Sequence, residues 1–576
     1  MPAILIQGGT LFDGRGGPGI SRDLLIESGK VSQIAEHLEP PPGAQVLDAR
    51  GLWVTPGFVD MHTHYDAEVE LSPGLSESVR HGVTTVVLGS CSLSLAVGEP
   101  QNLADMFCRV EAIPRSVVLP LLRDRKTWEG PASYFEHLDS LPLGPNVASF
   151  FGHSAMRMKA MGIARSLDKK VRPSAAELGE MDRLLGEALE AGYLGMSIQT
   201  LPWDKMDGDE FRSRPLPSVF ARWSEYRHFA RTLRARGKVL QAVPNISTKV
   251  NAVLIFLMSV GLWRKPLRLT ALSMMDIRAD RFAFRIAGWL CNQLNRFFGA
   301  DLRLQALPEV FDLWADGMDL VVFEEFGAGT AALHLQDAGE RAKLLRDPSY
   351  RAWFARQWRN RFLPRAFHRK LELCRVLAAP DEKLVGKTFA EIANERGQDV
   401  VETFLALCAE HGNALRWFTV MGNDRPEWLE RIVAHPAAIV GFSDAGAHLR
   451  NMAHYNFPLR MLKLVRDAEL AGRPFMTIGR AVQRLSGEIA GWLGLEAGTL
   501  EVGKRADLCI VDPTGLTDAV HEVAEQEMPE FGGLRRLVRR NDAAVLAVLI
   551  GGKLAWERGV PAPELGVQKL GQVLRA

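Results

Sequence analysis

The feature that most constrains the fold is a long alternation between short apolar runs and helix-like stretches. Runs such as Thr84–Gly89 and Val147–Gly152 are typical of buried parallel strands. Helix-like stretches such as Ala175–Ala191 and Val219–Arg236 separate runs of this kind. Because parallel strands are joined by crossover helices, an alternation that continues over several hundred residues predicts an α/β barrel.

The two ends of the chain differ from the middle. The first fifty residues hold short strand-like runs between turns, namely Ile4–Gln7, Asp23–Glu27, Val31–Ala35 and Gln45–Leu47. Strand-like runs return at Leu508–Asp512 and Ala543–Ile550. We therefore expect a small β-sandwich, built from residues 1–55 and 491–576, beside a barrel at 56–490.

Two segments inside the barrel region stand apart. The chain has 576 residues, more than the roughly 250–300 that one core holds, so we expect an insertion over the barrel mouth at about 280–375. The apolar run Val250–Trp263 is shorter than the roughly 18–20 residues that span a bilayer. It could line an acyl pocket or touch a membrane, but a buried helix is the commoner outcome for such a run.

Composition excludes several function classes. The formal net charge of +1 gives no global field that would favour nucleic acid or a membrane. Six cysteines without a CxxC pair indicate a reducing compartment. The segment Met1–Gly9 is too short and uncharged for a signal peptide, so we expect a cytoplasmic protein without a transmembrane segment. A homo-oligomer is left open.

The strongest chemical signal is an apolar stretch, Pro56–His64 (PGFVDMHTH), that ends in His62-x-His64. Residues i and i+2 of a strand point to one face, so both imidazoles can converge on one metal ion. Zinc suits imidazole ligands. Two histidines that only hydrogen-bond in a loop are the alternative.

Two later segments add groups of the same kind. Cys91 directly follows a buried strand, where a thiolate could bridge metal ions, although buried inert cysteines are common. Asp444 follows the apolar run Ile439–Gly441 and can bind metal or accept a proton from metal-bound water. A turn or a helix cap is the alternative for Asp444. His448 could face the substrate or cap the next helix.

Together these segments resemble the amidohydrolase superfamily, and within it the D-aminoacylase (N-acyl-D-amino-acid deacylase) branch. The matching stretches are Pro56–Glu68 (PGFVDMHTHYDAE), His81–Ala96 (HGVTTVVLGSCSLSLA), Gly152–Gly162 (GHSAMRMKAMG), Ser443–His448 and Gly498–Asp512. The resemblance covers most of the chain and is weakest between Trp203 and Phe442.

The resemblance implies a distorted (β/α)8 TIM barrel with zinc at its mouth and a small-molecule N-acyl substrate. It assigns His62, His64, Cys91 and Asp444 as metal ligands, with Asp444 also moving the proton. It further implies that His153 and Arg157 face the substrate. The guanidinium group of Arg157 could bind a carboxylate through two parallel hydrogen bonds, or it could form a structural salt bridge.

One departure from the family pattern concerns the metal. The family has two further histidine ligands, on strands five and six, and the matching segments Val239–Asn245 and Leu267–Asp276 contain none. Gln241, Asn245 and Asp276 are the polar candidates there. We therefore expect one ion rather than two, with Fe or Mn as alternatives to Zn.

The same departure leaves two other functions open. A cyclic-amide or other acyl-amine hydrolase of the superfamily would use the same ligands, although Gly195–Thr200 lacks the metal-bridging lysine typical of cyclic amidases. A barrel that has lost its catalytic activity and acts only as a binding protein is the second alternative. Glu324 and Glu325 are a further candidate carboxylate pair, with a solvated turn as the plainer interpretation.

Overall fold

The computed structural model describes residues 3–246, 248–363 and 365–576. Its centre consists of two parallel sheets. One has the order β6 (Phe58–Asp60), β7 (Val83–Leu88) and β8 (Asn146–Ser149). The other is built from β9 (Phe151–Gly152), β10 (Gly195–Gln199), β11 (Val239–Val243), β12 (Arg268–Ala271), β13 (Asp301–Ala306) and β17 (Ala438–Val440). The protein is therefore α/β, as the alternation predicts.

The two parallel sheets touch along both of their outer edges. At one edge Phe150 N donates to Leu88 O at 3.0 Å, and Leu194 N donates to Ser149 O at 3.0 Å. At the other edge Met61 N donates to Gly441 O at 2.8 Å. Backbone hydrogen bonds thus continue from each sheet to the other, and the carboxyl ends of their strands gather on one side.

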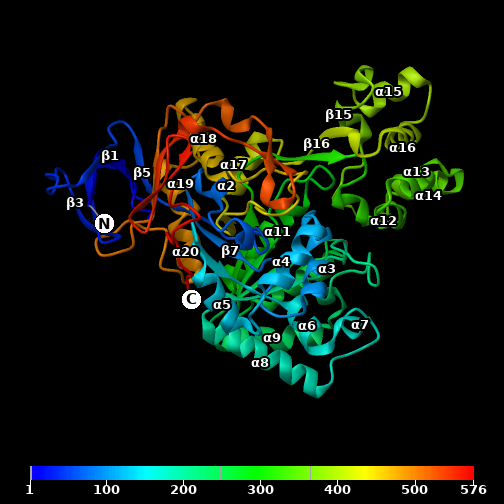
Figure 1. The fold of residues 1–576 in the computed structure, drawn as a ribbon, viewed down its shortest axis with the longest axis horizontal. Coiled ribbons are helices and arrows are strands. Elements are labelled where there is room, and N and C mark those ends of the chain that lie inside the picture. The colour runs from blue at the N-terminus through cyan, green and yellow to red at the C-terminus, as the bar shows by residue number, and fades with distance from the viewer. Residues whose placement is uncertain (1–2, 247, 364) are drawn as a thin grey trace.

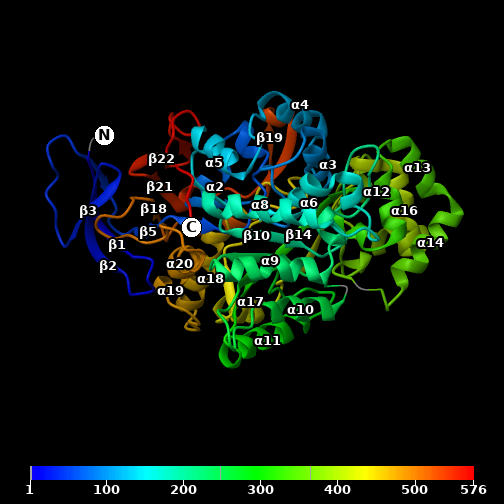
Figure 2. The same cartoon turned by 90° about the horizontal axis from the view of Figure 1, so that it is seen from below.

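Crossover helices cover the outside of these strands (Figures 1 and 2). They include α8 (Ala175–Ala191), α9 (Trp223–Ala235), α10 (Lys249–Met258) and α11 (Ala283–Phe297). The bounds of α8 follow from its sequence. Ser174 and Glu177 form a reciprocal capping box at its start, and Gly192, with φ of 101°, ends it in the left-handed conformation.

Strands from both ends of the chain join in one nine-stranded sheet. Its connection is the antiparallel pair of β5 (Trp53–Pro56) and β18 (Leu508–Val511). The other members are β1 (Ile4–Leu11), β2 (Ile20–Glu27), β3 (Lys30–Ala35), β4 (Gln45–Asp48), β21 (Val545–Ile550), β22 (Lys553–Glu557) and β23 (Val560–Pro561). The N-terminal strands lie at one end of the molecule (Figure 1).

A second hydrophobic core lies at the opposite end of the molecule (Figure 1). Its sheet consists of β14 (Phe311–Asp316), β16 (Arg416–Gly422) and β15 (Arg375–Ala378). Its helices are α12 (Gly327–His334), α13 (Ala338–Arg346), α14 (Pro348–Arg359), α15 (Phe389–Arg396) and α16 (Val400–His411). The expected insertion at 280–375 overlaps this unit only in part. Helix α11 packs in the main core and β13 belongs to a parallel sheet, whereas the second core runs from Leu313 to Met421 and includes Met452.

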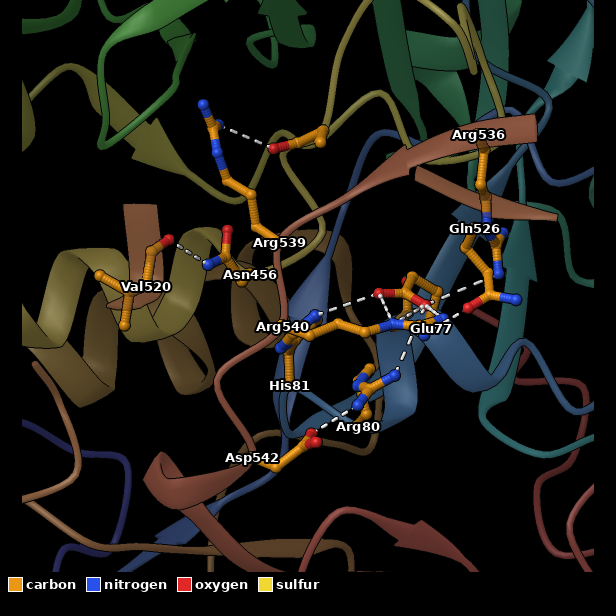
Figure 3. A network of polar contacts seen from close by, with 12 residues as sticks. Glu77, Arg80, His81, Asn456, Val520, Gln526, Arg536, Arg539, Arg540 and Asp542 are labelled. Carbon is orange, nitrogen blue, oxygen red and sulfur yellow. Dashed lines mark hydrogen bonds and ion pairs between the residues drawn. The ribbon is translucent and has the colours of Figure 1, made fainter. Parts of the chain in front are cut away.

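A buried ion network fixes the late β-hairpin, β19 (Ala524–Met528) and β20 (Leu534–Val538), to the segment between the first two parallel strands (Figure 3). At its centre is Glu77 of α2 (Ser76–Val79), whose side chain is 1% exposed. Arg540 Nη2 lies 2.7 Å and Arg536 Nη2 3.7 Å from Glu77 Oε2. Residues more than four hundred positions apart are therefore held together by charge.

Among the described residues, no helix is long and apolar enough to cross a membrane.

Candidate metal centre

The structure brings His62, His64, Cys91 and Asp444 together at the carboxyl ends of the parallel strands. Oδ1 of Asp444 lies 3.3 Å from Nε2 of His62 and 3.3 Å from Nε2 of His64. Sγ of Cys91 lies 3.3 Å from the same His62 nitrogen. Both histidines and Cys91 are buried, and their ligand atoms all lie within 4.8 Å of one another.

These separations fit a tetrahedral metal ion. Zinc bonds of about 2.0–2.1 Å to nitrogen or oxygen place two ligand atoms roughly 3.3 Å apart. Oδ1 of Asp444 is buried and accepts no hydrogen bond from the described residues. A buried carboxylate oxygen aimed at two imidazole nitrogens is the donor set that a cation requires.

Left-handed backbone positions aim two of these side chains. Cys91 has φ of 53° and Asp444 has φ of 57°, conformations that cost non-glycine residues of order 1–3 kcal/mol unless neighbours enforce them. The Cys91 turn is held by its own N–H, which donates to Gln241 Oε1 at 3.0 Å, and by Ser92 N, which donates to Ser197 Oγ at 3.0 Å. Side chains on the parallel strands β10 and β11 therefore fix the turn that carries the thiol.

Two side chains that sequence reasoning missed lie beside the imidazoles. Gln305 Oε1, on β13, lies 2.6 Å from Nδ1 of His62, and Glu111 Oε1 lies 3.0 Å from Nδ1 of His64. Since Gln305 Oε1 is an acceptor, Nδ1 of His62 carries the proton and its Nε2 keeps its lone pair toward Asp444. The Glu111 carboxylate lies beside the ring of His64 without a hydrogen bond to it. No local pattern marks Gln305 or Glu111, because both contacts depend on how distant segments pack.

Burial and mutual charge set the titration of this cluster. Burial lowers the pKa of His62 to about 4 and raises the pKa of the Cys91 thiol to about 12. Burial would also raise the pKa of Asp444, but the neighbouring imidazoles of His62 and His64 hold it far below its usual range. The carboxylate is therefore ionised at neutral pH, as a ligand or proton acceptor must be.

Strands β11 and β12 carry no histidine where the family would place its further ligands. Gln241 and Thr270 are paired neighbours on these strands and are fully buried. Of the other sequence-based candidates, Asp276 accepts hydrogen bonds from Arg281 and Arg425, and Asn245 donates its backbone N–H to Thr200 Oγ1. A neutral amide and a hydroxyl group thus stand on β11 and β12, where the family pattern has its further histidine ligands.

His153 and Arg157 are brought together by a carboxylate rather than by the metal cluster. Nε2 of His153 lies 3.0 Å and Nη1 of Arg157 lies 2.6 Å from Oε1 of Glu225, and both side chains are fully buried. The charges of both partners overcome burial and lower the pKa of Glu225 to about 2. Helix α6 (His153–Met161) also contacts the cysteine loop, where Ser154 N donates to Ser92 O at 3.0 Å.

A pocket of about 510 Å³ opens beside His448, between the strand-end loops and the second core. Its lining includes Asp204 and Lys205, and burial raises the pKa of Asp204 to about 6 against the opposing charge of His64. Most cationic side chains that line the pocket form ion pairs with carboxylates, for example Arg109 with Glu324. Lys205 forms no ion pair within the described residues.

The carboxylate pair Glu324 and Glu325 is occupied by structural contacts. Glu324 pairs with Arg109, and Glu325 Oε2 lies 3.1 Å from Arg369 Nη2. Backbone N–H groups of Ala366 and Phe367 donate to the other oxygen of Glu325. Glu324 therefore links the second core to Arg109 outside it, and Glu325 fixes a loop within it.

Sequence comparison identifies relatives over nearly the whole chain. An uncharacterised protein of Mycobacterium tuberculosis is 49% identical over 561 residues, which cover 96% of this chain and 92% of the relative. The N-acyl-D-glutamate deacylase of Alcaligenes xylosoxydans is 28% identical over 523 residues, which cover 89% of this chain and 88% of that enzyme. No protein-family model matches the chain.

Structure comparison agrees over the full length. The zinc- and phosphonate-bound N-acyl-D-glutamate deacylase of Bordetella bronchiseptica superposes with a TM-score of 0.65 at 22% identity, covering 100% of this chain and 99% of that one. A D-aminoacylase superposes with a TM-score of 0.62 at 21% identity, with the same coverage. The chain is therefore a full-length sequence relative of the N-acyl-D-amino-acid deacylases of the amidohydrolase superfamily, and it shares the fold of D-aminoacylase.

Proposed function

We propose that this protein is a metal-dependent hydrolase that removes the acyl group from an N-acyl-D-amino acid. The observation that carries the proposal is the position of Asp444 Oδ1, 3.3 Å from Nε2 of both His62 and His64. Related enzymes that act on N-acyl-D-glutamate and N-acyl-D-aspartate match nearly the whole chain, which supports the substrate class.

The residues of the cluster have separate tasks. When bound, a metal ion lowers the pKa of a water molecule to about 7 and polarises the substrate carbonyl. His62, His64 and Asp444 would hold the ion, with Cys91 as a further ligand. Gln305 keeps the His62 imidazole in the required tautomer, and the Glu111 carboxylate lies beside Nδ1 of His64. Asp444 accepts a proton from the attacking water and delivers it to the amide nitrogen as the C–N bond breaks. The products are a carboxylate and a free amine.

We propose that the protein binds one ion. A second site would draw on β11 and β12, where Gln241 and Thr270 replace the two histidines that the resemblance implies. A neutral amide and a hydroxyl are far weaker ligands for zinc than imidazole. The two parallel sheets would close around this site as a distorted eight-stranded barrel, in which β8 and β9, one residue apart, count as one strand. The nine-stranded sheet would be its sandwich.

The substrate carboxylate would be bound in the pocket beside His448. Lys205 supplies a cation there that no carboxylate of the described chain neutralises, and burial lowers its pKa. Arg157 is held by Glu225, so we propose that His153 and Arg157 support the Cys91 loop from behind. Strand β10 carries Ser197 and no lysine, which favours an open-chain amide over a cyclic one.

Hydrolysis of matched substrates tests this function. Metal-replete protein should release amine from N-acetyl-D-amino acids faster than from the L-enantiomers and should leave hydantoin intact. A folded, metal-replete protein that cleaves no amide in such a panel would contradict the proposal and favour a binding role.

A further inference from the structure

Helix α10 presents an apolar face to the outside of the molecule. Its outward side chains lie at helical spacings of three and four residues and have exposed fractions of 39–69%: Val250, Val253, Leu254 and Leu257. Such spacing places them on one face. The outer face of a surface helix is normally polar. The prediction of a buried helix is therefore wrong for this face of α10, whereas Ile255, Phe256 and Met258 on its other side are buried.

Helix α11 repeats the arrangement on larger side chains. Phe282, Ile286, Trp289 and Phe297 share one face and are 59–63% exposed. The opposite face of α11 packs inward through Phe284, Cys291 and Leu294. Helix α11 thus has a complete buried stripe and a second apolar stripe that no part of the described chain covers.

The two apolar faces form one surface. Lys249 Nζ pairs with Asp280 at 3.1 Å where the helices begin, and Gly261 N donates to Phe298 O at 3.1 Å where they end. Both helices lie together along one side of the molecule (Figure 2). Trp263, in the turn after α10, is 95% exposed. Large exposed apolar side chains gathered on two neighbouring helices and the turn between them mark an interaction site.

The same segment is strongly basic. Residues 249–298 contain eight Lys or Arg and two Asp, whereas the whole chain has a net charge of only +1. Both aspartates are neutralised, Asp276 by Arg281 and Arg425, and Asp280 by Lys249. The exposed cations beside the aromatic rings form no ion pair within the described residues: Arg264, Lys265, Arg285 and Arg296.

We propose that this surface, formed by α10, α11 and the turn at Trp263, docks on a membrane that contains anionic lipids. Exposed Trp and Phe side chains suit the boundary between headgroups and acyl chains, and unpaired basic residues around them attract anionic headgroups. A symmetric pair of copies would instead bring the two basic rims against each other, which is unfavourable. The proposal does not depend on the hydrolase function.

Vesicle co-sedimentation of the full-length protein tests the proposal. The protein should bind phosphatidylglycerol-containing vesicles and not pure phosphatidylcholine vesicles, and added salt should weaken binding. The triple variant Trp263→Ser, Trp289→Ser, Phe297→Ser should lose binding. Replacing Arg264 and Lys265 by Gln should weaken it roughly fivefold per residue, as expected for about 1 kcal/mol per cation.

A control variant replaces exposed apolar residues elsewhere, Leu470, Val560 and Val567, by Ser. It should bind vesicles like the wild type, and all variants should unfold at temperatures close to that of the wild type. The proposal is overturned if the wild type ignores anionic vesicles, or if the triple variant binds them equally well. A wild-type dimer in sedimentation velocity that the triple variant abolishes, without vesicle binding, would assign the surface to a second copy instead.

Discussion

Gln305 Oε1 lies 2.6 Å from Nδ1 of His62. A side-chain amide on β13 therefore fixes the orientation of an imidazole ring 243 positions earlier in the chain. The contact fixes the proton on Nδ1 and turns the lone pair of Nε2 toward Asp444. Outer partners of this kind decide how well a histidine binds metal.

Removing this acceptor should weaken metal binding. Gln305→Leu should lower zinc affinity about 10- to 100-fold at neutral pH, because the imidazole loses its fixed orientation. Competition with a chromophoric chelator measures the affinity. Gln305→Glu keeps an acceptor at the same place and should stay close to the wild type; equal affinities for all three proteins would contradict the orienting role.

Lys205 should act on substrate binding rather than on chemistry. Lys205→Met should raise KM for an N-acyl-D-amino acid roughly 10- to 100-fold, since a hydrogen bond to a charged group contributes about 1.5–3 kcal/mol, while kcat changes little. The matched control is the methyl ester of the same substrate, which has no carboxylate. A variant that loses activity equally on acid and ester would argue against a carboxylate contact.

Glu225 should make stability depend on pH. Its folded pKa of about 2 lies below the ordinary value of 4.5, so its stabilising effect is present above the ordinary value and is lost as pH falls toward the folded value. Glu225→Gln leaves Arg157 buried without its counter-charge and should cost about 3–5 kcal/mol of unfolding free energy at neutral pH.

Denaturant unfolding of wild type and Glu225→Gln at several pH values checks this. The difference in unfolding free energy should shrink as pH falls through the range between the two pKa values. Glu190, whose side chain is 75% exposed, provides the control variant Glu190→Gln. A difference that stays constant with pH would show that Glu225 contributes through packing alone.

The ion pairs at the buried centre of the network in Figure 3 should contribute to the free energy of unfolding, and those at its exposed edge should contribute little. Glu77→Gln should lower the free energy of unfolding by about 3–5 kcal/mol, because Arg536 and Arg540 lose a buried counter-charge. Asp542→Asn removes the partner of Arg80 at a site that is 49% exposed and should cost about 0–1 kcal/mol. Equal effects of the two substitutions would contradict this account.

The sequence predicts what local pattern determines. The bounds of α8 are confirmed residue for residue, since its capping box and Gly192 lie within the segment itself. His62, His64, Cys91 and Asp444 each directly follow an apolar strand, and parallel strands bring their carboxyl ends together.

Contacts that depend on how distant segments pack could not be predicted from the sequence. Glu111 and Gln305 lie in ordinary helix and strand sequence, and only the folded chain brings them to the histidines. The run Val250–Trp263 is interrupted only by Asn251, Ser259 and Gly261, so it has no continuous polar face to show which side is buried, and its exposed side could not be predicted. The direction of Arg157 likewise depends on Glu225, which lies on another helix.

The most direct test of the central claim is a titration of metal-free protein with zinc, followed by the initial rate of deacylation of an N-acetyl-D-amino acid. The account predicts that activity rises to a plateau at one ion per chain and that His62→Ala and Asp444→Asn remain inactive. A plateau at two ions would contradict the single site. Absence of activity at any zinc, iron or manganese concentration would contradict the proposed hydrolase itself.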